Sequence, residues 1–167
     1  MTFVLRPVDK TDEQWIDILL QDWWAGSNII TRGHIHHVDE YPGFVALEGK
    51  NRVGLITYHI DGEECEITSL NSLAEGKGIG TALVESVKKA ARAAKCQNIF
   101  IITTNDNTDA LHFWQKRGFR IAAVRINEIE KTRKIKPGIP LTNEEGIPIS
   151  DEIELDMKLT GKGKTYA

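Results

Sequence analysis

Residues 73–83, LAEGKGIGTAL, hold three alternating glycines, Gly76, Gly78 and Gly80. An apolar strand pattern precedes them, and a helix with apolar residues at helical spacing follows at once. Glycine lets the backbone approach a ligand closely and turn where a side chain would clash. The start of a helix offers unpaired N–H groups and the positive end of the helix dipole. This order of strand, glycine turn and helix predicts an anion site, most often for phosphate.

Two common phosphate-binding fingerprints do not fit these glycines. The dinucleotide pattern G-x-G-x-x-G would need a glycine at Thr81 or Leu83, and the P-loop would need Ser or Thr at Gly78. A nucleotide-binding protein of either kind is therefore disfavoured. A plain glycine-rich turn at the start of a helix stays open as an alternative.

The composition narrows the class of protein. A chain of 167 residues is long enough for one domain with a sizeable core, and its net charge of −3 gives no basic footprint for nucleic acid. Cys65 and Cys96 have neither a disulfide framework nor metal-ligand spacing, so we expect no metal and a reduced, cytoplasmic setting. With no leader and no apolar run long enough to cross a bilayer, we expect no membrane association.

The N-terminal part of the chain predicts a strand over residues 3–8 and then an amphipathic helix over residues 15–23. Thr11 and Gln14 offer a capping box for this helix. The next segment, residues 24–41, has no clear period.

Three histidines, His34, His36 and His37, fall within that segment. A metal site or a pH-sensing group is one interpretation. No carboxylate or cysteine at a ligand-like spacing completes a metal set, so we interpret the segment as a solvated loop. Such a loop could line a pocket for an acceptor substrate.

Three antiparallel strands are predicted next, over residues 43–48, 53–60 and 64–70, and they form a meander with short hairpin turns. The glycine stretch and a helix to about Lys95 follow. Residues 98–104, NIFIITT, are an apolar run typical of a strand buried on both faces. A strand, a helix and a second strand of this kind predict a right-handed parallel unit.

The rest of the chain closes the predicted fold. Residues 105–108 cap a helix that ends at Gly118, and Phe119 is placed for the apolar contact of such a C-cap. The further elements are, in order, a strand over 119–126, a short helix over 127–136, an irregular loop over 138–150, a half-buried strand over 153–159 and a polar tail over 160–167.

Two motifs at a consistent separation carry a resemblance to a known family. The run from Glu75 to Gly80 fits (Q/R)-x-x-G-x-(G/A), the pyrophosphate loop of the GNAT superfamily of N-acetyltransferases, although Glu75 replaces the usual Gln or Arg. Asn107 and Ala110 stand in N-x-x-A spacing, and FWQKRGF at residues 113–119 is similar to the family's F-Y-x-K-x-G-F. With the order of predicted elements, the chain from Phe3 to Leu159 resembles a whole GNAT domain.

The resemblance implies an α/β (α+β) fold. Its mixed central sheet would have about seven strands, flanked by about four or five helices and splayed between the fourth and fifth strands. Residues 1–159 would form a single domain with an insert at 127–151 before the last strand, and we expect residues 160–167 to be a flexible tail. A homodimer, with an exposed edge of the last strand as one route, is a further expectation.

The resemblance also implies acetyl-CoA as co-substrate, bound in the wedge between residues 64–70 and 98–104. Its diphosphate would lie on the N–H groups of residues 76–81, and Lys77 would either add a charge there or remain solvated. The pantetheine arm would pair with backbone near residues 70–73. The residues assigned to acetyl-CoA are Leu70, Asn71, Leu73, Gly76, Lys77, Gly78, Ile79, Gly80, Thr81, Asn105, Asn107, Ala110 and Phe113.

The implied reaction is direct attack on the thioester by a primary amine of a small molecule or by an exposed amino group of a peptide. The ammonium must first lose a proton. Glu66 is the candidate base, because a glutamate on this strand serves so in several relatives, and alternation places it on one face with Glu64 and Thr68. His59 is the second candidate, and an ordinary solvated strand residue is the alternative for both.

Trp114 stands where the family usually has a tyrosine that protonates the leaving thiolate. An indole N–H is no acid near neutral pH. Either the thiolate departs unaided, as a thiol with a pKa of about 8.5 can, or another group such as Tyr58 or Tyr41 helps, although nothing in the sequence places either tyrosine. Because Trp114 and Glu75 both depart from the family pattern, a non-catalytic acetyl-CoA-binding sensor or scaffold remains the alternative function.

Overall fold

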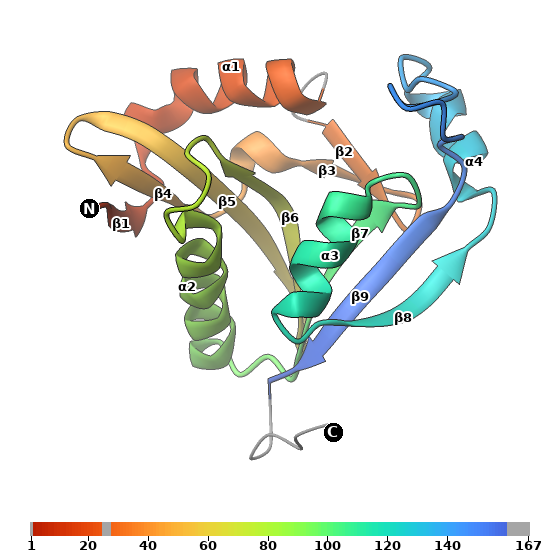
Figure 1. Cartoon of the computed structure of the whole chain (residues 1–167). Helices are drawn as coiled ribbons and strands as arrows, with labels where there is room; N and C mark the ends of the chain where they lie inside the picture. The colour runs from red at the N-terminus through yellow and green to blue at the C-terminus, as the bar shows by residue number, and fades with distance from the viewer. Residues whose placement is uncertain (1, 25–27, 160–167) are drawn as a thin grey trace.

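The computed structural model describes residues 2–24 and 28–159, so the predicted tail at 160–167 lies outside the described residues. One seven-stranded sheet, in the order β1-β4-β5-β6-β7-β9-β8, forms the centre of the molecule (Figure 1). All its neighbouring strands are antiparallel except β6 and β7, so the predicted mixed sheet is confirmed. Its strands are β1 (Val4–Pro7), β4 (Gly43–Glu48), β5 (Asn51–Asp61), β6 (Glu64–Ser72), β7 (Asn98–Thr104), β8 (Arg120–Arg125) and β9 (Glu152–Lys158).

Both faces of the sheet are covered. Helices α2 (Ile79–Ala93) and α3 (Thr108–Lys116) lie on one face (Figure 1). Helix α1 (Glu13–Trp24) lies on the other face, with a separate two-stranded sheet of β2 (Asn28–Thr31) and β3 (His34–His37). A short fourth helix, α4 (Glu128–Ile135), connects β8 to the loop before β9. Across the described ranges, none of the helices is long and apolar enough to cross a membrane.

The β2–β3 hairpin replaces the solvated loop that the sequence analysis expects. The two strands pair over their whole lengths, and a 3-10 turn over Val38–Glu40 follows. Arg32 and Gly33 make the turn with φ of 51° and 72°, the left-handed twist that a two-residue hairpin turn requires. Arginine is an unusual residue for this conformation, which explains why the sequence gives so weak a turn signal. Residues 25–27 of the expected loop lie outside the described part of the chain.

The start of α1 also differs from the prediction. A 3-10 turn over Lys10–Asp12 precedes the helix. Asp9 caps this turn by accepting a hydrogen bond from the backbone N–H of Thr11. Asp12 completes the box by accepting from the backbone N–H of Asp9, so the box is Asp9 with Asp12 and not Thr11 with Gln14. A carboxylate accepts a backbone N–H more strongly than a neutral hydroxyl does.

Strand β9 departs from the predicted pattern of one buried and one exposed face. Glu152 and Glu154 belong to the face expected in solvent, yet they are only 1% and 7% exposed. β9 pairs with β7 on one side and with β8 on the other, because its chain returns between them. The expected route to a dimer through an exposed edge of the last strand is therefore wrong; β1 and β8 are the edges of this sheet.

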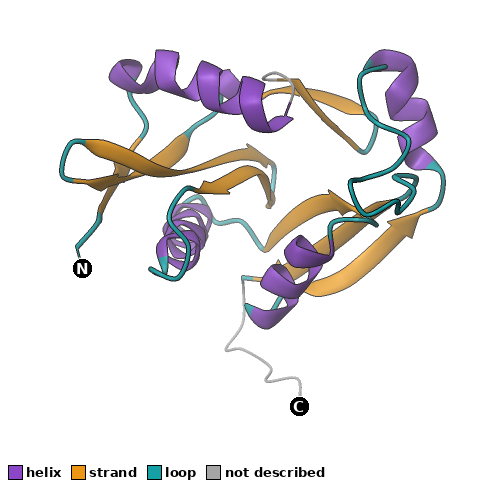
Figure 2. Ribbon diagram, turned by 45° about the horizontal axis from the view of Figure 1, so that its top comes forward, coloured by secondary structure: helices purple, strands orange, loops and turns teal. Residues whose placement is uncertain are grey.

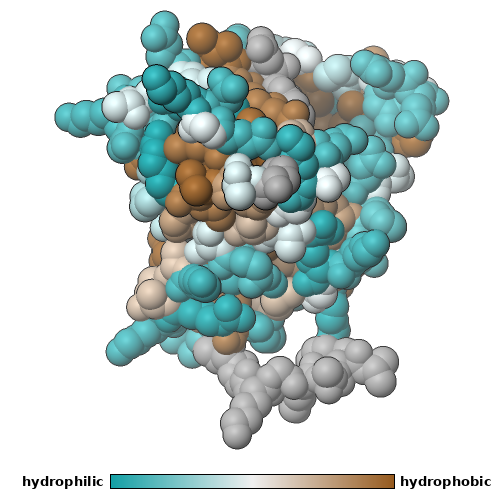
Figure 3. All heavy atoms as spheres, turned by 60° about the vertical axis from the view of Figure 1, so that its left-hand side comes forward, coloured by the Kyte–Doolittle hydropathy of each residue, from teal (hydrophilic) through white to brown (hydrophobic). Residues whose placement is uncertain are grey.

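The surface on the side of β1 is mostly hydrophilic. In Figure 3, apolar residues gather in the upper half of this view, and polar side chains border them. Val4 and Ile18 are among the large apolar side chains that the N-terminal part of the chain exposes. Exposed apolar side chains are normal on a folded protein, so we assign this area no role.

Asp12 joins β1, α1 and β5 through its charge. Its carboxylate is fully buried and accepts hydrogen bonds from both terminal nitrogens of Arg6, at 2.8 and 2.9 Å, and from Nε of Arg52 at 2.8 Å. The hydrogen bonds from Arg6 outweigh the opposing effect of burial and hold the pKa of Asp12 well below its usual range. The 3-10 turn that leads into α1 is thus tied to β1 and β5 through one buried carboxylate.

We expect Asp12→Asn to lower the free energy of unfolding at pH 7 by about 2 kcal/mol, because two arginines lose their carboxylate partner. Since the folded pKa is lowered, this stabilisation is complete above the unfolded pKa of about 4 and is lost as the pH falls through the folded value. Urea unfolding at successively lower pH should show variant and wild type converging. The control is Asp17→Asn, exposed on α1, with an expected change within about 0.5 kcal/mol.

Candidate active site

The site begins where β6 and β7 part. Their pairing ends at Ile67↔Ile101 although both strands continue, and Figure 2 shows the two halves of the sheet diverging. At that point Thr68 is an additional residue in β6, and Thr57 of β5 bonds to the hydroxyls of both Thr68, at 2.8 Å, and Ser69, at 2.6 Å. Such a bulge bends a strand and ends its pairing. The predicted splay between the fourth and fifth long strands is confirmed.

A cavity of about 290 Å³ opens from this wedge toward α2 and α3. Backbone and side chains of β6 and β7 form two of its walls, and Trp114 on α3 closes part of a third. Five of the residues that the sequence assigns to acetyl-CoA line it, namely Leu70, Gly80, Asn107, Ala110 and Phe113. The lining of the cavity is mostly apolar, which suits an extended thioester arm.

The glycine stretch turns the chain from this cavity into α2. Gly76 and Gly78 have φ of 74° and 76°, a conformation that other residues rarely adopt, and Gly78 is the N-cap residue. Because Gly78 has no side chain, it cannot cap the N–H groups in the first turn of α2, and these groups suit an anion. A Cβ at Gly80 would lie 3.3 Å from the ring of Phe113, so glycine lets the start of α2 approach α3.

Two cations lie near this turn. Lys77, which the sequence analysis considered, pairs with Glu48 at 2.8 Å on the surface. Arg117, which it did not select, donates to the hydroxyl of Thr81 at 3.0 Å and lies 3.5 Å from the ring centroid of Phe113. Burial lowers the pKa of Arg117, but a guanidinium stays charged in proteins. Arg117 is therefore a second candidate for binding an anionic group at the turn.

The other assigned residues lie around the cavity without lining it. Ile79 is a core residue of α2, and Leu73 is exposed just before the glycines. Asn71 is fully buried on β6, and neither polar atom of its side chain has a hydrogen-bond partner among the described residues. Asn105 accepts from the backbone of Ser150 and Asp151 and donates to the carbonyl of Pro148, so its side chain holds the long loop to the end of β7.

A second cavity, of about 210 Å³, lies on the opposite face of the sheet, under the β2–β3 hairpin. Both candidate bases, Glu66 and His59, line it, and they face each other across β5 and β6. The other lining residues are Thr31, Arg32, His34, His36, Asp61, Glu64 and Phe100. The structure therefore brings the meander and the histidine segment together at one pocket that is rich in carboxylates.

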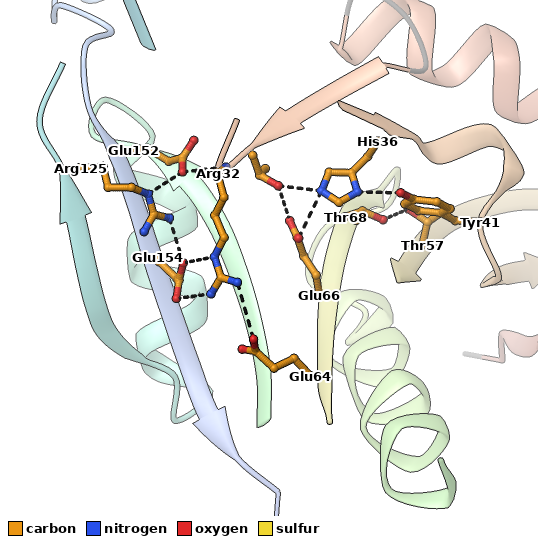
Figure 4. Close-up of polar contacts among 11 residues, drawn as sticks. Arg32, His36, Tyr41, Thr57, Glu64, Glu66, Thr68, Arg125, Glu152 and Glu154 are labelled. Atoms are coloured by element: carbon orange, nitrogen blue, oxygen red, sulfur yellow. Dashed lines mark hydrogen bonds and ion pairs between the residues drawn. The ribbon is translucent and has the colours of Figure 1, made fainter. Parts of the chain in front are cut away.

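Glu66 is held in this second cavity by the hairpin (Figure 4). Its carboxylate is 6% exposed, accepts from the hydroxyl of Thr31 at 2.7 Å and lies 3.3 Å from Nε2 of His36. The same Nε2 is 2.8 Å from Thr31 Oγ1, and Nδ1 of His36 is 2.7 Å from the hydroxyl of Tyr41. The ring of His59 stacks on that of Tyr41, with 4.8 Å between centroids.

Ion pairs with two buried carboxylates hold the hairpin turn against β9. Arg32 donates two hydrogen bonds to Glu154, at 2.8 and 2.7 Å, its backbone N–H donates to Glu152, and its guanidinium lies 4.1 Å from the ring centroid of Phe100. Arg125 of β8 bonds to both carboxylates at 2.8 Å. Burial alone would raise the pKa of Glu154, but the hydrogen bonds from Arg32 and Arg125 outweigh it and lower that pKa.

Sequence reasoning placed His34 and His36 in a solvated loop, yet His36 is 2% exposed and contacts the candidate base. Of the other members of this hydrogen-bonded chain, Thr31 was not considered, and Tyr41 was considered only as an acid for the leaving thiolate. A signal was present in the β-branched run Ile29-Ile30-Thr31 and in the histidines two residues apart, which place one face of a strand toward a common neighbour.

The geometry matches a known family. The sequence model of the Acetyltransferase (GNAT) family fits residues 6–119. The chain belongs to this family. It is therefore an acyltransferase, and the predicted resemblance is confirmed.

Two relatives are similar over most of their length. The uncharacterized protein YdhI of Bacillus subtilis is 49% identical over 138 residues, which cover 82% of this chain and 86% of that protein. The uncharacterized protein YxbD of the same organism is 41% identical over 154 residues, 92% of this chain and 97% of that one.

Solved structures share the fold at lower identity. A Bacillus subtilis acetyltransferase in complex with CoA has a TM-score of 0.69 at 18% identity, covering 95% of this chain and 100% of that one. A GNAT family acetyltransferase from Elizabethkingia anophelis with acetyl-CoA bound has a TM-score of 0.66 at 22% identity, covering 93% and 97%.

We expect Arg125→Met to lower the free energy of unfolding by roughly 3 kcal/mol, because two buried carboxylates then share only Arg32. Adding Glu154→Gln to this variant should recover part of the loss, since it removes one unpaired buried charge. Urea unfolding of the single and double variants measures both effects. A double variant whose loss equals the sum of the two single losses would contradict the ionic coupling.

Proposed function

We propose that this acyltransferase is an N-acetyltransferase that transfers the acetyl group of acetyl-CoA to the primary amine of a small molecule or to an exposed amino group of a peptide. One observation carries the proposal. The buried carboxylate of Glu66 lies at the parting of β6 and β7, with a narrow apolar cavity on one face of the sheet and a carboxylate-rich cavity on the other.

The residues of the first cavity suit acetyl-CoA. We assign the thioester arm to the wedge, beside Leu70, Ala110 and Phe113, and the diphosphate to the first-turn N–H groups after Gly78. Asn107 lines the cavity, and its Oδ1 caps α3 by accepting from the backbone N–H of Ala110 at 3.1 Å. Its Nδ2 is the better partner for the amides of the arm, because both the oxygen and the nitrogen of the Asn105 side chain are bonded to the long loop. Backbone N–H groups of β6 beyond Ile67 would polarise the thioester carbonyl.

The second cavity suits a cationic acceptor. Asp61, Glu64 and Glu66 contribute three carboxylates, against one arginine, Arg32, which pairs with Glu154 at 2.7 Å and with Glu64 at 3.7 Å. Glu66 would take the proton of the ammonium, and the neutral nitrogen would then attack the thioester carbon. The carbon–sulfur bond breaks as the carbon–nitrogen bond is completed, the thiolate leaves, and the second proton of the attacking nitrogen passes to the thiolate or to water, which gives the neutral amide. His59 remains the second candidate for the base, since its ring lines the same cavity.

The same proposal places the enzyme in a reducing compartment, the cytoplasm. Cys65 and Cys96 are both buried free thiols, and desolvation raises the pKa of Cys65 to about 12. Thiols in this state are ordinary core residues of reduced proteins and not reactive groups.

We expect Glu66→Gln to lower kcat/KM at neutral pH by about 100-fold or more, because general-base catalysis contributes on this scale. The rate of the variant should rise with pH, since the amine then loses its proton to water. Affinity for acetyl-CoA, measured by calorimetry, should stay unchanged. The control is Glu63→Gln, an exposed neighbour on the same hairpin.

Thiol release from acetyl-CoA with a panel of amines and peptides separates the enzyme from a binding module. A wild-type protein that acetyl-CoA stabilises against heat, but that releases no thiol with any acceptor, would favour the non-catalytic sensor or scaffold. An unchanged pH–rate profile in Glu66→Gln would instead remove only Glu66 from the role of base.

We expect Trp114→Phe to keep kcat within about tenfold of the wild type, because an indole N–H does not protonate a departing thiolate. Its ring packs edge-on against Phe113 and Phe119, with centroids 4.9 and 5.0 Å apart, so the loss should appear in the free energy of unfolding, at about 1–2 kcal/mol. Steady-state kinetics and urea unfolding measure the two effects. A loss of several orders of magnitude in kcat would show that Trp114 takes part in the chemistry.

A further inference from the structure

We propose that His36 is a positioning residue for catalysis, and that Tyr41, His36 and Thr31 form a hydrogen-bonded chain which keeps Glu66 ionised and oriented as the base. The role in catalysis rests on the proposed N-acetyltransferase function. The hydrogen-bonded chain itself does not, so the two can fail separately.

Counting donors assigns the tautomer of His36. The hydroxyl of Thr31 has one hydrogen, and an ionised Glu66 only accepts, so this hydrogen belongs to the 2.7 Å contact with the carboxylate. Thr31 Oγ1 must then accept from Nε2 of His36, 2.8 Å away, and Nε2 therefore carries a proton. In the neutral ring Nδ1 is left as an acceptor for the hydroxyl of Tyr41 at 2.7 Å.

The far end of the chain is a dependable donor. Burial raises the pKa of Tyr41, and the charge of Glu66 adds to the effect. The phenol therefore keeps its proton well above neutral pH and can donate it to Nδ1 throughout the working range. Donation at Nδ1 keeps the proton of the neutral ring on Nε2, beside Glu66, which is 3.3 Å away.

This support matters because Glu66 is buried. A carboxylate out of water tends to take up a proton, and a protonated Glu66 could no longer accept one from the substrate. Hydrogen bonds to the ionised form oppose that tendency, and they are strong where water is excluded. The two groups that donate to the carboxylate of Glu66 come from β2 and β3, so the hairpin, and not the central sheet, supplies these hydrogen bonds.

Several other charged or ionisable groups surround the imidazole, and Asp61 of β5 is one that lines its cavity. His34 of β3 lies 4.6 Å away between ring centroids, and His59 of β5 lies 5.8 Å away. Arg32 and Glu64 line the same cavity. Protonation of Nδ1 in acid would force Tyr41 to act as acceptor and would pair an imidazolium with Glu66, which weakens Glu66 as a base. The acid limb of the pH–rate profile thus reports a coupled system.

The experiment compares His36→Leu, His36→Gln and Tyr41→Phe, each checked for folding by thermal unfolding. We expect His36→Leu to lower kcat by about tenfold or more, on the scale of other supporting hydrogen bonds, with the KM for acetyl-CoA unchanged. Its acid limb should move to higher pH, because the ionised carboxylate loses a hydrogen bond that favours it over the protonated form. His36→Gln can still donate from a similar position and should restore much of the rate.

The matched control is His37→Gln, the next residue of β3, whose side chain is exposed and bonded to Asn28. It should leave kcat and the acid limb unchanged. Tyr41→Phe should let the ring of His36 change tautomer and should shift the acid limb in the same direction as His36→Leu, by a smaller amount.

Nitrogen-15 NMR of the histidine rings in the ligand-free protein gives a readout that needs no activity. We expect the Nε2–H tautomer at His36 in the wild type and a mixture in Tyr41→Phe. A wild-type ring protonated at Nδ1 alone would overturn the proposal, as would a His36→Leu enzyme with unchanged kcat and acid limb. A wild type without acetyl transfer would overturn the proposed function, and with it the role of the chain in catalysis.

Discussion

The loss of pairing between β6 and β7 beyond Ile67↔Ile101 is the constraint on which the rest of the structure depends. A parallel pair that stays closed would bury the backbone of both strands and leave no passage through the sheet. The bulge at Thr68 opens the pair, and each face has a cavity there, lined by successive residues such as Glu66 on one side and Ile67 on the other. In the proposed reaction, the two substrates would approach from opposite sides without competing for space.

The second cavity owes its walls to charge rather than to apolar packing. Arg32 and Arg125 neutralise Glu152 and Glu154, which the sheet would otherwise bury at high cost. Because Arg32 is also the hairpin turn, the same ion pairs fix the position of β2 and β3 above the sheet. The hairpin is short, and two strands alone are only marginally stable in water, so this anchoring decides where Thr31 and His36 lie.

The sequence predicts the parts of the fold that depend on local signals. Three such signals each predict one local structure: the glycines at Gly76 and Gly78 a turn, the apolar run before residue 105 a buried strand, and Gly118 the end of a helix. The structure has these three elements at those positions. The hairpin at residues 28–37 escaped because Arg32 supplies the left-handed turn that glycine or asparagine usually supplies. The burial of the glutamates on β9 could not be predicted, because the arginines that neutralise them are distant in the sequence. The role of His36 was not predicted for the same reason, since it depends on contacts with Glu66 and Tyr41 and not on its neighbours in the chain.

The pairing of Arg32 with Glu154 also has a consequence for the order in which the molecule is made. The two residues are 122 positions apart, so the hairpin leaves the ribosome long before the carboxylate that anchors it. The early strands β4 to β6 can already pair with their neighbours at that stage, whereas the second cavity lacks one of its walls. A nascent chain would therefore form its first strands early and complete its second cavity last, only when β9 has entered between β7 and β8.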